Sequence, residues 1–233
     1  MNNANVHREM LINVAVALGT KLCQKMVFVG GCTTSLLLTD AFTKEQVRHT
    51  DDVDLIIHVL GISPYYELQE ELSSRNFKEN PDVDDPICAM KLGELRVDFM
   101  PDDESILGFS NRWYRQAFNT AEDYQLTTEI TIKLVTPVFF IVTKLEAYLG
   151  RGKSDPLESR DIEDFLNLFS GRKELVGEIK QSSEELQFYI SNQIEVLLVN
   201  RDFEYAIQST ALNDKDREDL VFSRLESVVG FKK

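Results

Sequence analysis

Apolar residues follow two patterns, which divide the chain into a part that alternates between strands and helices and a part that is helical. In the first 136 residues, short apolar or alternating runs are typical of strands, and apolar spacings of three and four are typical of helices. The strand-like runs lie at 26–29, 51–60, 87–91, 94–100 and 126–134. Helices are predicted at 6–24, 33–38 and 64–76, and Leu92-Gly93 joins two of the strands as a hairpin.

From Pro137 onward, every periodic segment of the sequence is helical. Apolar residues recur at helical spacing over 138–149, 159–169, 182–198 and 216–229. The sequence therefore predicts an α/β (α+β) fold, with a small mixed β-sheet in residues 1–136 and a helical domain in residues 137–233.

Composition narrows the class of protein. Hydrophobic residues make up 43% of the chain and charged residues 27%, which is typical of a globular protein. No apolar run reaches the ~18 residues of a membrane span and the polar N-terminus shows no signal-peptide pattern, so we expect a cytoplasmic protein with no membrane association. The three cysteines are scattered and the histidines lack metal-ligand spacing, which argues against disulfides and zinc.

The net charge of −14 disfavours a protein held on nucleic acid by bulk electrostatics. Much of the acidic excess lies between Glu67 and Glu104, whereas residues 144–173 are balanced in charge. The charge therefore argues against a nucleic-acid substrate but does not exclude one. Such a substrate would have to contact a local patch of four basic side chains: Lys144, Arg151, Lys153 and Arg172.

Three carboxylates stand in strand-like apolar surroundings and form the main candidate for chemistry. Successive side chains of a strand point to opposite faces, so Asp52 and Asp54 share one face about 7 Å apart while Val53 enters the core. Asp98, between Val97 and Phe99, repeats this design on another predicted strand. Carboxylates gathered at one edge repel one another unless a cation lies between them, and oxygen ligands of this kind suit Mg²⁺.

A Gly-Gly turn precedes these acids in the chain. Gly30 and Gly31 end the first apolar strand, and glycines there allow backbone N–H groups to approach a phosphate closely. Thr33 and Thr34 add hydroxyl groups just after the turn. Each feature alone has a structural explanation, because Gly-Gly turns and acids at strand ends are common. Their combination in this order is what indicates a phosphate and metal site.

The three features together resemble the DNA-polymerase-β-like nucleotidyltransferase superfamily. Its pattern is an apolar residue followed by Gly-Gly, then Asp-x-Asp, then a third acid between apolar residues. The matching residues are Val29-Gly30-Gly31, Asp52-Val53-Asp54 and Val97-Asp98-Phe99. The 20 residues between Gly31 and Asp52 exceed the commonest spacing in that superfamily, and a longer first helix and loop would account for them.

A closer resemblance is to the AbiEii/MenT-type nucleotidyltransferases of bacterial toxin–antitoxin and phage-abortive systems. Their Gly-Gly-Thr and Arg-x-(Ser/Thr)-x-Asp-x-Asp stretches are similar to Gly30-Gly31-Cys32 and to the segment from Arg48 to Asp54. Because Cys32 stands where that group has Thr, the phosphate-contacting hydroxyl would come from Thr33 or Thr34. A helical Lys and an Arg-Asp-x-x-Asp segment are matched by Lys144 and Arg160-Asp161-Ile162-Glu163-Asp164.

The resemblance implies roles for these residues. Asp52, Asp54 and Asp98 would hold Mg²⁺, Gly30, Gly31 and the nearby hydroxyls would cradle NTP phosphates, and Arg48 would orient Asp52 or contact a phosphate. Lys144 would neutralise the departing pyrophosphate beside Asp161. Structural alternatives remain open: Lys144 can lie at the edge of a core with its amine in water, and acids in the first turn of a helix are favoured by its dipole.

The predicted function is Mg²⁺-dependent transfer of a nucleoside monophosphate from an NTP to a hydroxyl acceptor. The toxin resemblance implies an RNA or tRNA end or a protein hydroxyl as acceptor and a cognate antitoxin as partner. The acidic composition equally allows a small-molecule acceptor, as in antibiotic-modifying nucleotidyltransferases. Two further interpretations are a non-catalytic binding module with this fold and a chance match in an unrelated α/β protein.

Overall fold

The structure, a computed structural model, describes residues 2–79, 87–151 and 155–232. Its contacts group the chain into two units. The first unit contains Met1–Thr33 and Arg48–Thr136, and the second contains Thr34–Val47 and Pro137–Lys233. The change of unit after Thr136 falls where the periodicity changes, whereas the sequence analysis placed residues 34–47 with the first domain.

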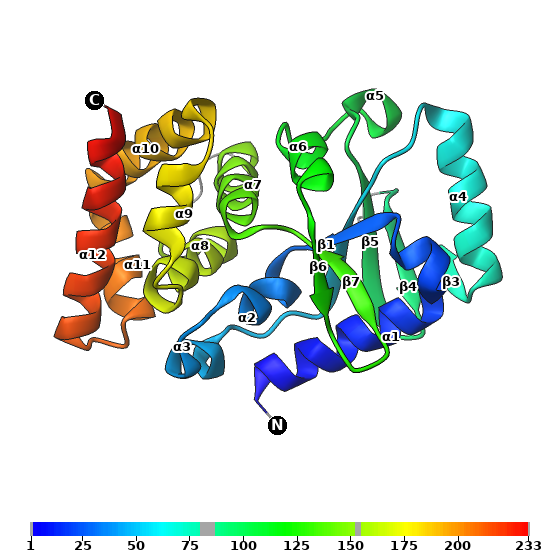
Figure 1. The fold of residues 1–233 in the computed structure, drawn as a ribbon, viewed down its shortest axis with the longest axis horizontal. Coiled ribbons are helices and arrows are strands. Elements are labelled where there is room, and N and C mark those ends of the chain that lie inside the picture. The colour runs from blue at the N-terminus through cyan, green and yellow to red at the C-terminus, as the bar shows by residue number, and fades with distance from the viewer. Residues whose placement is uncertain (1, 80–86, 152–154, 233) are drawn as a thin grey trace. The chain divides into compact units, whose positions relative to one another are not determined.

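A seven-stranded mixed sheet forms the centre of the first unit (Figure 1). The strand order is β3-β4-β5-β2-β1-β7-β6. β2 pairs in parallel with β5 and β1 with β7, and the other neighbours are antiparallel. The strands are β1 (Met26–Val29), β2 (Asp52–Ile57), β3 (Phe77–Glu79), β4 (Ala89–Leu92), β5 (Leu95–Pro101), β6 (Glu122–Gln125) and β7 (Thr131–Leu134). The predicted combination of a mixed sheet and a helical C-terminal half is confirmed.

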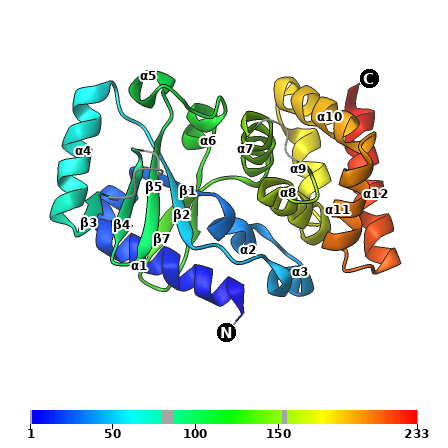
Figure 2. The ribbon, with the colours of Figure 1, turned by 180° about the vertical axis from the view of Figure 1, so that it is seen from behind.

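Helix α1 (Asn3–Cys23) covers part of this sheet with an apolar face. Its residues Leu11, Val14 and Leu18 are fully buried, and the helix contacts β1, β2 and β7. Burying one apolar side chain of this size stabilises the folded state by roughly 1.5–3 kcal/mol. Helix α4 (Ile62–Ser74) lies beside β3 at one end of the strand order (Figures 1 and 2). Two short helices, α5 (Glu104–Leu107) and α6 (Tyr114–Asn119), follow β5.

The predicted strand at 126–134 is a strand only in its second half. The run 126–134 contains only β7, and β6 precedes it, so this region is a hairpin. The turn between them is closed because the backbone N–H groups of Leu126 and Thr127 both donate to the Ile130 carbonyl. The Thr127 hydroxyl accepts from the N–H groups of Glu129 and Ile130. Local side-chain bonding of this kind ends a strand that apolar spacing alone would continue.

The second unit is built around α8, which contacts α7, α11, α12 and α3. Ten of the twelve residues of α8 are buried, including polar side chains. Among the helices in the described ranges, none combines the length and apolar character that a membrane span requires. The helices of this unit are α2 (Thr34–Leu37), α3 (Ala41–Gln46), α7 (Pro137–Gly150), α8 (Arg160–Gly171), α9 (Leu175–Gln181), α10 (Glu184–Leu198), α11 (Arg201–Thr210), α12 (Lys215–Val229) and the 3₁₀ turn η2 (Gly230–Lys232).

Residues 34–47 are attached to the C-terminal end of α8. The backbone N–H groups of Thr39 and Asp40 donate to the Gly171 carbonyl at 2.9 and 2.8 Å. A Cβ at Gly171 would lie 2.7 Å from the Cβ of Thr43, so glycine permits this close approach. This attachment explains the long spacing between Gly31 and Asp52, because most of the intervening residues, 34–47, belong to the second unit.

Candidate active site

Strands β2 and β5 bring the predicted carboxylates onto one face of the sheet. The two strands are parallel, with Asp54 opposite Asp98 and Asp52 opposite Arg96. Residues paired in this way point to the same face, and so do residues two apart on one strand. Asp52, Asp54 and Asp98 therefore share a face, which we call the carboxylate edge. Asp98 is buried, whereas Asp52 and Asp54 are half-buried.

The Gly-Gly turn after β1 lies directly against this edge. Val29 pairs with Asp54 across the antiparallel β1–β2 ladder, and the next residue, Gly30, has a φ of +79°. A Cβ added at Gly30 would lie 1.8 Å from Oδ2 of Asp54. No side chain fits in that space, and the left-handed backbone also favours glycine. The sequence thus places glycine at the position where the Asp54 carboxylate needs room.

Two buried cysteines, Cys32 and Cys88, lie near the carboxylate edge and have raised pKa values. Burial, together with the Asp54 and Asp52 carboxylates, raises the pKa of Cys32 well above its usual value. Burial also raises the pKa of Cys88 to about 12, with a smaller contribution from Asp98. Both thiols therefore stay protonated near neutral pH and are poor nucleophiles.

A basic side chain that sequence analysis did not select completes the edge. Arg96 binds Asp98 with two parallel hydrogen bonds, Nε to Oδ1 at 2.8 Å and Nη2 to Oδ2 at 2.9 Å. Such a bidentate pair favours the charged carboxylate and fixes its orientation. The sequence held a usable signal, because residues two apart on a strand share a face and Arg96 precedes Asp98 by two. At the other end of the edge, the Thr50 hydroxyl donates to Asp52.

The sequence analysis expected Asp52, Asp54 and Asp98 to hold Mg²⁺ together, and the structure does not form a metal site of that size from its described residues. Across residues 2–79, 87–151 and 155–232, no group of three or more His, Cys, Asp or Glu side chains is arranged to hold a metal ion. Mg²⁺ in phosphate-transferring sites is commonly held by one or two carboxylates plus substrate phosphates and water. Asp54 and Asp98, paired in register, supply two such carboxylates.

The threonines after the turn are engaged within the protein. The Thr33 hydroxyl donates to the Gly30 carbonyl at 2.8 Å, and the Thr34 hydroxyl donates to Asp164 at 3.3 Å. Both threonines are fully buried. The structure therefore uses these hydroxyls to hold the turn and α2, in contrast to the expected phosphate contact. Arg48 is half-buried, and its Nη1 donates to the His49 carbonyl.

Lys144 and Asp161 form a separate cluster inside the second unit. The Lys144 ammonium lies 2.7 Å from Oδ2 of Asp164 and 3.3 Å from Oδ1 of Asp161. All three side chains are at most 9% exposed. Arg151 also pairs with Asp161. We call Lys144, Asp161 and Asp164 the buried ion cluster. Two buried acids neutralise the Lys144 ammonium. This position differs both from a lysine that contacts pyrophosphate and from a core-edge lysine with its amine in water.

The basic patch expected for nucleic-acid contact is also paired within the second unit. Lys144 and Arg151 contact Asp161, and Arg172 binds Glu178 through two hydrogen bonds of 2.6 and 2.7 Å. Lys153 lies outside the described residues. Paired cations attract a polyanion less strongly, so these contacts weaken the patch as an RNA-binding surface.

Comparisons with models of known protein families and with curated protein sequences find no match to this chain. The nucleotidyltransferase resemblance therefore rests on the sequence motifs alone.

Proposed function

We propose that the first unit is a Mg²⁺-dependent nucleotidyltransferase, with the carboxylate edge as its catalytic site. The observation that carries the proposal is the contact between Gly30 and Asp54. These residues belong to two motifs 24 positions apart in the chain, and they lie so close together that only glycine fits beside the Asp54 carboxylate. Asp98, in register with Asp54 on β5, adds the third motif to the same face. A chance match of sequence motifs gives no reason for this convergence.

The roles of the residues follow from their positions. Mg²⁺, bound with the nucleotide by Asp54 and Asp98, would neutralise charge on the triphosphate. Asp52, on the same face two residues before Asp54, would help to hold a second ion. Arg96 is a planar donor already at the edge and can turn from Asp98 to a phosphate oxygen. A new P–O bond forms between the acceptor hydroxyl and the α-phosphorus, the α–β bond breaks, pyrophosphate leaves, and the hydroxyl proton passes to solvent or to a carboxylate.

The charge distribution favours a small hydroxyl acceptor over an RNA end. The protein carries a net charge of −14, and the described cations of the basic patch are engaged with carboxylates. RNA binding would have to overcome this repulsion through other contacts. An RNA end, a protein hydroxyl and a small molecule therefore remain the acceptors to compare, with the small molecule preferred.

A second candidate is a non-catalytic nucleotide-binding module. The bidentate Arg96–Asp98 pair favours it, because the carboxylate already has a strong partner that is not a metal. The module binds Mg²⁺ and NTP but transfers nothing, whereas the enzyme does both.

The decisive experiment combines binding with transfer. The protein is incubated with each α-labelled NTP and Mg²⁺, in parallel with total RNA, a protein extract and a panel of aminoglycosides. We expect label in one acceptor fraction and a loss of orders of magnitude in rate for Asp54→Ala. Mg²⁺ with NTP at about 100 times Kd should stabilise the protein by about 2.7 kcal/mol, measured as a rise in Tm, and Asp54→Ala should abolish that rise.

Asp123→Ala is the matched control, since Asp123 is an exposed acid on β6 that pairs with Lys133. It should behave as wild type in both assays. Binding that depends on Asp54 without transfer to any acceptor would favour the module. If Mg²⁺ with NTP stabilised the wild type and Asp54→Ala equally, the carboxylate edge would not be the ligand site, and both candidate functions would be wrong.

A further inference from the structure

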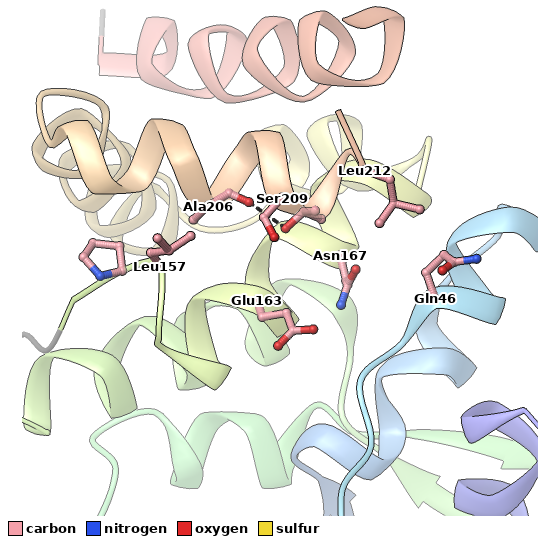
Figure 3. A pocket seen from close by; sticks show the side chains of 9 residues that line it. Gln46, Leu157, Glu163, Asn167, Ala206, Ser209 and Leu212 are labelled. Atoms are coloured by element: carbon pink, nitrogen blue, oxygen red, sulfur yellow. Dashed lines mark hydrogen bonds between the residues drawn. The ribbon is translucent and has the colours of Figure 1, made fainter. Parts of the chain in front are cut away.

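A cavity of about 240 Å³ lies within the second unit, between α8, α3 and α11. Figure 3 shows Asn167 and Glu163 projecting from α8 into the same space, with Gln46 of α3 on its border. Ser209 and Thr210 of α11 contribute hydroxyl groups. Leu157 and Leu212 give the cavity an apolar wall. No residue of the carboxylate edge takes part.

Asn167 indicates that this cavity is built for a ligand. Its side chain is only 4% exposed, and its Nδ2 has no hydrogen-bond partner among the described residues. A buried N–H group left unpaired costs roughly 1–3 kcal/mol, so such groups are normally satisfied by protein, water or ligand. On a helix that buries ten of its twelve residues, an apolar residue at this position would avoid the cost. The unpaired amide thus points to an acceptor group supplied from outside the chain.

The chemistry of the lining restricts the class of that ligand. None of the described residues that line the cavity carries a positive charge, and Glu163 carries a negative one, which disfavours an anion. A simple cation would leave the Asn167 donor unsatisfied. A hydroxyl group both donates and accepts, so it can receive a hydrogen bond from Asn167 and donate one to Glu163.

We propose that this cavity binds a small uncharged polyhydroxylated compound of about monosaccharide size. A hydroxyl group of the compound would accept a hydrogen bond from Asn167 and others would contact Glu163 and Ser209, while its C–H face would pack on Leu157 and Leu212. The cavity is smaller than the ~300–1,000 Å³ of drug-sized sites, which agrees with a ligand of this size. The proposal does not depend on the activity of the carboxylate edge.

The test measures binding of D-glucose, D-ribose and myo-inositol to the full chain by saturation-transfer NMR and calorimetric titration. Inorganic phosphate and tetramethylammonium serve as the charged comparisons. At least one polyol should bind saturably to the wild type. Asn167→Leu should weaken that binding about tenfold, the effect of one lost hydrogen bond at the strong end of the usual range. Asn192→Leu, the same change on α10 outside the cavity lining, should leave it unchanged.

Two further variants keep the test conclusive. If Asn167→Leu does not fold, Asn167→Ala removes the same amide without adding bulk. Asp54→Ala should retain polyol binding, which separates failure here from failure of the proposed transferase. The proposal is overturned if no polyol binds, if the Asn167 variants bind as tightly as the wild type, or if phosphate or tetramethylammonium occupies the cavity in preference to the polyols.

Discussion

The carboxylate edge and the buried ion cluster use the same kinds of residue in opposite ways. In the cluster, the side chains of Lys144, Asp161 and Asp164 are 9%, 5% and 1% exposed. At the edge, Arg96 is 32% exposed and Asp98 is 11% exposed. The cluster is closed to water and its charges satisfy one another. The edge keeps one partner accessible, so a ligand can compete for its charges.

This difference teaches that a residue type gives little indication of role until its exposure is known. A charge held away from water is costly, and its partner offsets that cost. A charge that reaches water is less strongly bound to its partner, and the pair can exchange one contact for another. We therefore expect substitutions in the cluster to affect mainly stability and substitutions at the edge to affect mainly ligand binding.

The largest effect should come from removing the cation of the buried ion cluster. Lys144→Met removes the ammonium that lies 2.7 Å from the buried Asp164 carboxylate, and breaking a buried ion pair in this way costs about 3–5 kcal/mol. Denaturant unfolding measures the loss. Lys173→Ala is the control, because Lys173 is 78% exposed and its pairing with Glu174 should contribute little.

A double variant sharpens this first test. Lys144→Met combined with Asp164→Leu removes both members of the closest pair and should recover most of the lost stability. If the single variant is as stable as the wild type, the cluster is not the closed ion pair that the structure shows.

The next effect should come from the glycine that makes room for Asp54. Gly30→Ala combines a left-handed backbone with a Cβ that would overlap the Asp54 carboxylate, and we expect a cost of about 3 kcal/mol. Stabilisation by Mg²⁺ and NTP should disappear as well. Unfolding with and without ligand measures both.

Gly93→Ala provides the matched control for this substitution. Gly93 has a φ of +63° but nothing within 4 Å of an added Cβ, so only the backbone cost of about 1 kcal/mol should appear. Equal losses for the two variants would mean that the contact with Asp54 carries no constraint.

The smallest effect concerns an accessible acid–cation pair in the second unit. Asp40 caps α3, accepting from the Thr43 N–H at 2.8 Å and the Thr43 hydroxyl at 2.6 Å, and it lies 3.3 Å from Arg217. Asp40→Ala should cost about 1 kcal/mol at pH 7. The Thr43 hydroxyl, followed by its N–H and Arg217, lowers the pKa of Asp40 below 3.8.

The sign of the pH dependence follows from that lowered pKa. The charged form is favoured in the folded state, so its contribution is present above pH 3.8 and is lost as the pH falls through the folded-state value. Stability curves of the wild type and Asp40→Ala should converge in acid. Asp40→Asn keeps a capping oxygen without the charge, so its stability should exceed that of Asp40→Ala by a small amount that does not depend on pH. A difference that grows in acid would contradict the assignment.

Periodicity was a good guide to the long elements of this fold and a poor one to the short ones. It placed β1 over Met26–Val29 and most of α7, α8, α10 and α12, because each buries a wide apolar face. It missed elements that are short or dominated by polar residues: β3, β6, α3, α5, α6, α9 and α11. Short elements form because neighbours hold them, and a single sequence does not reveal those neighbours.

For the site, sequence spacing predicted which side chains share a face of the sheet, but it did not predict which groups they pair with. The alternation of Asp52, Val53 and Asp54 correctly indicated one carboxylate face, and β5 brings Asp98 onto it. Nothing in the sequence indicated that Lys144 would be enclosed by acids, because that depends on how α7 packs against α8. The sequence also could not predict that the Asn167 amide would be unpaired, because helix packing decides which buried polar groups form hydrogen bonds.

The assignment of residues 34–47 to the second unit has a consequence for how the chain is made. Thr34 bonds to Asp164 and Thr39 to Gly171, partners 130 and 132 positions later. At about 5–20 residues per second, synthesis leaves α2 and α3 waiting roughly 7–26 s for α8 to emerge. Helices of four and six residues do not persist alone during such an interval. The nascent chain therefore keeps this segment unfolded until α8 has been synthesised.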